Sequence, residues 1–199
     1  MKKTLRSLAI IAFATLASCS SDDDTNTNVD QSQYVKFNDA IFKQALIDNS
    51  AINTNNDEEI SYQEAELATE ILSLENLGIE DLTGIEAFIN IKTLSAFNNQ
   101  LTQVDLSKNS KLKQILLENN KLVALDISML PEVEDLKVHT NNLNSLNVAN
   151  GNNFFFSRMQ AQGNANLNCI QIDQDFNPGS NWISDMQTNY SYSDCNEPR

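Results

Sequence analysis

The stretch Leu112–Leu122, which reads LKQILLENNKL, decides the fold of this 199-residue chain. Its residues Ile115 and Leu117 are two positions apart, which is the period of the buried side of a β-strand. Asn120 follows three residues later, and a leucine closes the stretch. The same spacing recurs 21 residues earlier and 21 residues later, at Ile91, Leu94, Ala96, Asn99 and Leu101 and at Val133, Leu136, Val138, Asn141 and Leu143.

Two weaker copies flank the three regular ones. One supplies Leu72, Leu74, Leu77 and Ile79, and the other supplies Phe156, Met159, Ala161, Asn164 and Leu167. The set is identified as a leucine-rich repeat, whose copies stack into a solenoid with atypical end repeats. The sequence therefore predicts an α/β fold, in which about five short repeats at residues 71–173 form a parallel concave sheet.

Polar residues inside the repeats have a predicted structural role. A buried amide must be hydrogen-bonded, so the repeated asparagine is expected to bind turn backbone and link neighbouring coils. The positions concerned are Asn99, Asn120, Asn141 and Asn164. Alternating residues at 104–106, 125–127 and 146–148 predict a second row of short extended segments on the convex side, in place of long helices.

Function in such a fold depends on the strand residues that face solvent. Phe97 and Leu116 are apolar at such positions, and clustered exposed apolar residues indicate contact with a partner. The candidate ligand-binding residues of the concave face are Glu75, Phe97, Leu116, Glu118, Lys137, His139 and Arg158. The alternative is a featureless polar face on which two hydrophobic residues happen to lie.

The N-terminal residues predict export. A basic start at residues 2–6, an apolar run at residues 8–16 and small residues before Cys19 are typical of a secretory signal peptide, here residues 1–18. The segment Leu16-Ala17-Ser18-Cys19 resembles the lipobox of bacterial lipoproteins. The resemblance implies that Cys19 is acylated and anchors the mature chain in the bacterial outer membrane.

Residues 19–33 are polar and acidic and predict a disordered tether. Their serine–aspartate run resembles the signal that sends lipoproteins of some Gram-negative bacteria to the cell surface, and a plain solvated linker would read the same. Removal of residues 1–18 leaves 10 basic against 27 acidic residues, a net charge of −17. Such a surface repels nucleic acid and anionic lipid, so we expect no nucleic-acid partner.

A helical cap is predicted at residues 34–70, with a first helix that begins after Asn38. Within the cap, residues 53–64 have the spacing of an EF-hand calcium loop. Its possible calcium ligands are Asn53, Asn55, Asp57, the Glu59 carbonyl and Glu64. Glu58 stands where such loops usually have glycine, and Ser61 with Glu64 forms the pattern of a capping box. The loop is either a weak calcium site, which would be the chain's only cofactor, or a metal-free helix connection.

The segment from Phe37 to Glu86 resembles the helical N-terminal cap of internalin-type proteins. With the repeats, the resemblance covers roughly residues 34–173. It implies a surface protein that binds other proteins through its concave face. The repeats here are few and short, so the binding surface is expected to be smaller than in that family.

The last residues, 174–199, predict a C-terminal cap that covers the final coil. With Cys19 acylated, Cys169 and Cys195 remain as one pair in an exported protein and are expected to form a disulfide. This bond would pin the cap to the fifth repeat.

No catalytic constellation is visible, because His139 is the only histidine and no phosphate loop or nucleophile elbow occurs. The sequence predicts a non-enzymatic interaction or adhesion module with an unknown protein or glycan partner. A structural subunit of a cell-envelope complex without an external ligand is the main alternative, and a hydrolase built on the repeats is the remote one.

Overall fold

The computed structural model describes residues 33–193 and 195, which lie in one compact unit, Gln31–Arg199. Cys19, the signal peptide and the predicted tether up to residue 32 lie outside the described residues, so these assignments stay predictions. Among the residues that are described, no helix has the length and apolar character needed to cross a membrane.

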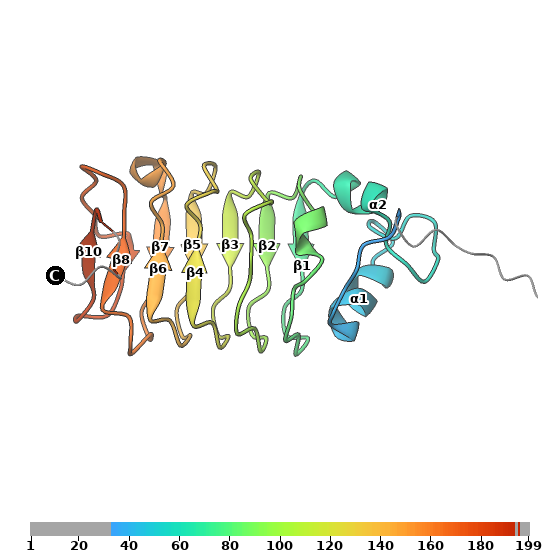
Figure 1. Cartoon of the computed structure of the whole chain (residues 1–199), viewed down its shortest axis with the longest axis horizontal. Coiled ribbons are helices and arrows are strands. Elements are labelled where there is room, and N and C mark those ends of the chain that lie inside the picture. Colours follow the sequence, from blue (N-terminus) through green and yellow to red (C-terminus); the bar gives the residue numbers. More distant parts are fainter. Residues whose placement is uncertain (1–32, 194, 196–199) are drawn as a thin grey trace, which may run out of the picture. The chain divides into compact units, whose positions relative to one another are not determined.

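Two parallel sheets run along the unit (Figure 1). The larger sheet has the order β1-β2-β3-β5-β7-β9, formed by Ile71–Ser73, Thr93–Ser95, Gln114–Leu116, Asp135–Lys137, Arg158–Gln160 and Trp182–Ile183. The smaller has the order β10-β8-β6-β4, formed by Asn189–Ser191, Cys169–Gln171, Ser145–Asn147 and Ala124–Asp126. The predicted solenoid with a parallel sheet is confirmed.

The inward side chains of successive strands stack on one another in the core. Leu94, Ile115 and Leu136 are register partners, and each is fully buried. This stacking explains the 21-residue period, because each coil must return the next leucine to the same place.

The asparagine at the end of each strand links two coils, as predicted. Asn141 Nδ2 donates to the Leu117 carbonyl of the preceding coil at 2.9 Å and to the Val138 carbonyl of its own coil at 3.1 Å. Its Oδ1 accepts the Leu122 N–H at 2.9 Å. Asn99, Asn120 and Asn164 make the corresponding bonds.

The smaller sheet confirms the second row of extended segments at β4 and β6, and β8 and β10 continue it. Residues 104–106 lie outside this sheet, contrary to the expectation. The turn that follows is nevertheless the same, because Asp105 Oδ1 accepts the Ser107 N–H at 2.9 Å as Asp126 accepts the Ser128 N–H after β4.

The residues after Ile172 extend the solenoid rather than only covering it. β9 pairs with β7, with Trp182 opposite Met159, and β10 pairs with β8, with Tyr190 opposite Ile170. The tail therefore forms a sixth coil. The leucine pattern did not predict this coil, because aromatic residues occupy its inward positions. The Cys169–Cys195 disulfide is confirmed.

The cap contains two short helices, α1 (Ala40–Ile47) and α2 (Tyr62–Leu67), and the solenoid carries two 3-10 turns, Ile85–Ala87 and Asn153–Phe155. The N-cap of α1 is Asp39 rather than Asn38. One Asp39 oxygen accepts the Ile41 N–H at 2.8 Å, and the other accepts the Glu80 N–H at 2.7 Å. This carboxylate thus ties the cap to the first coil, which a helix-capping rule applied to α1 alone does not reveal.

Candidate ligand-binding face

The solvent-facing side of the six-stranded sheet, which is the predicted concave face, carries three rows of side chains. Members of a row lie on successive coils in hydrogen-bonded register. The upstream row is Ile71, Thr93, Gln114, Asp135 and Arg158. The central row is Ser73, Ser95, Leu116, Lys137 and Gln160. The downstream row is Glu75, Phe97, Glu118, His139 and Gln162. All seven candidates named from the sequence lie in these rows.

The upstream row is occupied by its own hydrogen bonds. Arg158 Nε lies 3.0 Å from Asp135 Oδ1, and its Nη2 lies 2.5 Å from Oδ2. Gln114 Nε2 donates to the same Oδ2 at 2.9 Å. Burial raises the pKa of Asp135, but the hydrogen bonds from Arg158 and Gln114 lower it by more than burial raises it. The pKa therefore lies below the ordinary value. Arg158 is therefore held by the protein itself, although the sequence suggested it as a ligand contact.

The downstream row has polar atoms that no protein group satisfies. Glu118 Oε2 and Gln162 Oε1 are buried without a hydrogen-bond partner in the part of the chain that the structure describes, and Ser95 Oγ in the central row is in the same state. His139 lies between Glu118 and Gln162 in the row, and its Nδ1 is 3.2 Å from Thr140 Oγ1. Since buried polar groups are nearly always paired, the partners of these atoms are water or another molecule.

Apolar side chains lie near Glu118. Phe97 precedes it in the downstream row, and Leu116 of β3 lies two residues before it in the chain. Both are half-buried, while Ile71 at the first coil is 58% exposed. The face therefore joins a small apolar area to uncommitted polar groups.

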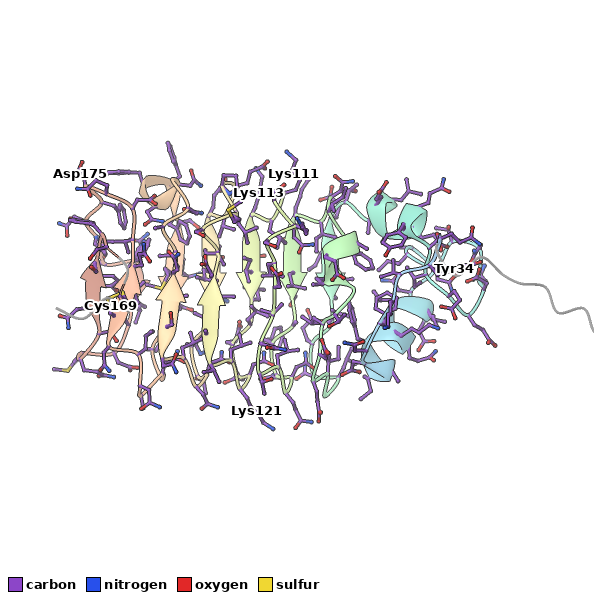
Figure 2. The ribbon with its side chains drawn as sticks, in the orientation of Figure 1. Tyr34, Lys111, Lys113, Lys121, Cys169 and Asp175 are labelled. Atoms are coloured by element: carbon purple, nitrogen blue, oxygen red, sulfur yellow. A yellow bond between two sulfur atoms is a disulfide. The ribbon has the colours of Figure 1, made fainter. Side chains whose placement is uncertain are left out.

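Most lysines near this face are used at the edges of the solenoid. Figure 2 shows Lys111 and Lys113 at one edge and Lys121 at the opposite one. Lys111 lies 3.0 Å from Glu132 and Lys113 lies 3.9 Å from Glu134, in each case on the next coil. No such ion pair is found for Lys137 within the described residues, so it stays available on the face.

The loop with EF-hand spacing closes through its own hydrogen bonds. Glu64 Oε1 accepts the Thr54 N–H at 2.9 Å, and Oε2 accepts the Ser61 N–H at 3.0 Å and the Ser61 hydroxyl at 2.8 Å. The capping box is thereby present. Burial raises the pKa of Glu64, but these bonds lower it more, so its pKa lies below the ordinary value.

The other proposed calcium ligands are also engaged. Asn53 Nδ2 donates to the Asp57 carbonyl at 2.8 Å, and Asp57 accepts the Glu59 N–H and the Asn55 amide, each at 2.8 Å. Among the side-chain atoms of this loop, only Asn53 Oδ1 is buried without a hydrogen-bond partner in the described structure. In the described part of the chain no group of three or more His, Cys, Asp or Glu residues could hold a metal. The loop fits a metal-free closure better than a calcium shell, and calcium binding stays a prediction.

A polar hollow of about 400 Å³ crosses the four-stranded sheet, lined among others by Asp105, Asp126 and Asn147. Each of these side chains accepts the N–H two residues ahead, from Ser107, Ser128 and Ala149. Their repetition therefore has a structural cause, namely the turn that follows each convex segment.

Sequence reasoning missed one exposed feature. Phe154 and Phe155 are 70% and 72% exposed on the 3-10 turn, which a hydrogen bond from Asn153 Nδ2 to the Val148 carbonyl holds at 2.7 Å. The signal was available, because Val133 and Phe156 are 23 residues apart while the earlier coils repeat every 21. The two extra residues build this turn.

No protein-family model and no curated protein matches the sequence. One similar solved structure is the functional domain of InlJ from Listeria monocytogenes, which includes a cysteine ladder, with 19% identity over 66% of this chain and 37% of that chain and a TM-score of 0.49. Another is an internalin, InlF, from the same species, with 21% identity over 68% of this chain and 43% of that chain and a TM-score of 0.49. The chain spans less than half the length of either structure. Its function is therefore argued from its own residues.

Proposed function

We propose that the chain is an exported, non-enzymatic interaction module that binds a protein or glycan through the solvent-facing side of its six-stranded sheet. The observation that carries this proposal is the downstream row, where Glu118 and Gln162 bury unpaired acceptor atoms and Glu118 is next to Phe97 in the row and two residues after Leu116 in the chain. A buried unpaired polar atom costs stability, and a binding partner can satisfy it.

The test is capture by the compact unit Gln31–Arg199, immobilised and exposed to surface proteins and glycans of neighbouring cells. We expect the wild type to retain a partner that Phe97→Ala/Leu116→Ala does not. The matched control is Val123→Ala/Met129→Ala, since these residues are 46% and 66% exposed and lie outside the six-stranded sheet. Thermal unfolding of each protein checks that it folds. Equal capture by all three would refute the proposal.

We further propose that the module is held at the cell surface by an acylated Cys19. Support comes from the lipobox-like segment and the acidic residues that follow it. In whole cells, Cys19→Ala should move the protein from the membrane fraction to the soluble fraction. Retention of this variant in the membrane would rule out the anchor.

A second candidate function is that of a subunit in an envelope complex, favoured by the exposed pair Phe154 and Phe155. Such a subunit would be shielded, whereas a surface binder is open to added protease. The test is protease treatment of intact cells. If the wild-type chain resists digestion and the Phe154→Ser/Phe155→Ser variant is digested, this candidate is favoured over the first.

A further inference from the structure

The unpaired buried atoms of the molecule are concentrated on one face. Five side-chain atoms are buried without a partner among the described residues, and three of them, Ser95 Oγ, Glu118 Oε2 and Gln162 Oε1, belong to the six-stranded sheet's solvent side. Ser95 is only 1% exposed, so solvent does not reach it easily. All three atoms can accept a hydrogen bond, and the carboxylate and amide oxygens can do nothing else. A ligand that fits them must donate.

The charges around these atoms favour a cationic donor. On this face the charged groups of the described coils are Glu75, Glu118, Asp135, Lys137 and Arg158, together with Asp185 on the sixth coil, which accepts the Gly163 and Asn164 N–H groups. Asp135 and Arg158 neutralise each other through two hydrogen bonds. Three carboxylates and one ammonium then remain on a chain whose formal net charge is −14. An anionic ligand would meet net repulsion here, whereas a cation is attracted.

The apolar neighbours define the shape of that cation. Phe97 and Leu116 are half-buried beside Glu118, and long basic side chains bury their methylene stems on such surfaces. Glu118 and Gln162 lie two coils apart, about 10 Å at the strand spacing, with His139 between them. The planar guanidinium has five donors and can serve acceptors on more than one side.

We infer that the downstream row binds an arginine side chain of a protein partner, with the guanidinium on Glu118 and Gln162 and the stem on Phe97 and Leu116. The inference rests on the proposed function, because it names the ligand chemistry of the same face. It selects a protein over a neutral glycan, because sugar hydroxyls can donate to these oxygens but bring no positive charge to the Glu118 carboxylate.

The test uses fluorescent Leu-Arg-Leu-Arg-Leu-Arg and the same peptide with citrulline, the neutral isostere of arginine, in about 0.15 M salt, where the Debye length is about 8 Å. We expect Kd for the arginine peptide to be roughly tenfold lower than for the citrulline peptide, as for a charge-assisted hydrogen bond. Glu118→Gln should remove that preference. Glu132→Gln takes the same charge from an edge of the solenoid, and it should change Kd less than about twofold, as exposed charges do.

Equal binding of the two peptides, or equal effects of Glu118→Gln and Glu132→Gln, would overturn the inference. Binding of neutral maltohexaose that depends on Glu118 would do so as well, in favour of a glycan. If the arginine preference is absent while Phe97→Ala/Leu116→Ala still loses its captured partner, only the ligand chemistry is wrong. If that double variant also captures normally, the proposed function itself fails.

Discussion

Two kinds of polar side chain lie two residues apart near the strand ends, and they differ in whether their polar atoms have hydrogen-bond partners. The corner asparagines, such as Asn120 and Asn141, are buried with both amide atoms bonded to backbone of two coils. Glu118 and Gln162 in the downstream row each bury an oxygen that has no partner. The first set explains why the chain forms a solenoid. The second set contributes nothing visible to the fold, which is why it points to a ligand.

The largest expected effect on stability is that of removing a corner asparagine. Asn141→Ala removes bonds to Leu122, Leu117 and Val138 and leaves buried backbone groups unpaired, so we expect the free energy of unfolding to fall by about 3 kcal/mol. The measurement is urea denaturation followed by circular dichroism. Asn142→Ala, at the exposed neighbouring position, is the control and should change little. Similar midpoints for both variants would show that the asparagines do not stabilise the solenoid.

A carboxylate of the cap whose oxygens are hydrogen-bonded should make stability depend on pH. Burial raises the pKa of Asp39, but the N–H groups of Glu80, Phe42, Ile41 and Asp81 lower it more, so its pKa lies below the ordinary 3.8. A depressed pKa means that the stabilisation is present above the unfolded value and is lost as pH falls through the folded one. We expect Asp39→Asn to lower stability at pH 7 by about 1 kcal/mol, the usual worth of an N-cap, and to lose less than the wild type on acidification.

Denaturant titrations at neutral pH and below the ordinary aspartate pKa measure this effect. Asn142→Ala is the control, because Asn142 is exposed and carries no titratable group, so the pH profile should match that of the wild type. A wild-type and an Asp39→Asn profile of the same slope would contradict the role given to Asp39.

A smaller effect is expected within the binding face. Asp135→Ala leaves Arg158 and Gln114 without their shared partner, and should cost about 1 kcal/mol, limited by the solvent exposure of Arg158. Gln162→Ala removes an unsatisfied acceptor, and we expect a change within about 0.5 kcal/mol. Thermal unfolding of both variants decides the point. If Gln162→Ala lowers stability as much as Asp135→Ala does, then the downstream row stabilises the fold as the upstream row does.

The last expected effect concerns calcium and depends on whether the loop binds it. If the loop binds calcium with the weak affinity of extracellular modules, a tenfold excess over Kd adds only about 1.4 kcal/mol. We expect Glu64→Gln to destabilise the cap even in chelator, because Glu64 accepts bonds from Thr54 and Ser61 in the metal-free loop. Melting in millimolar calcium and in chelator separates the two roles. A calcium-dependent rise that Glu64→Gln removes would establish the metal site, and an unchanged variant in chelator would contradict the hydrogen-bonded closure.

Periodic features of the fold could be predicted from the sequence. The leucine positions, the corner asparagines and the strand register all follow from one 21-residue pattern, because each coil repeats the same contacts. The sixth coil was not predicted, since Trp182 and Tyr190 fill its inward positions. The role of Asp39 was not predicted either, because its partner Glu80 is 41 residues away in the sequence.

The site could be predicted only in part. Register alone placed Phe97, Leu116 and Glu118 on one face, and alternation made Asp135 an exposed residue. In the structure Asp135 is 9% exposed, because Arg158 and Gln114 from the coils on either side lie against it. Such lateral bonds depend on side-chain rotamers, which a repeat pattern does not encode. The sequence therefore indicates which residues share the face but not which of them are free to bind.

Site-specific photocrosslinking on living cells tests the central claim most directly. A benzoylphenylalanine in place of Phe97 reports on the solvent side of the six-stranded sheet, and one in place of Val123 reports on an exposed position outside it. The account predicts a discrete crosslinked product with a partner from position 97, absent from position 123 and lost when Glu118→Gln is added. A product from position 123 and none from position 97 would contradict the assignment of the binding face.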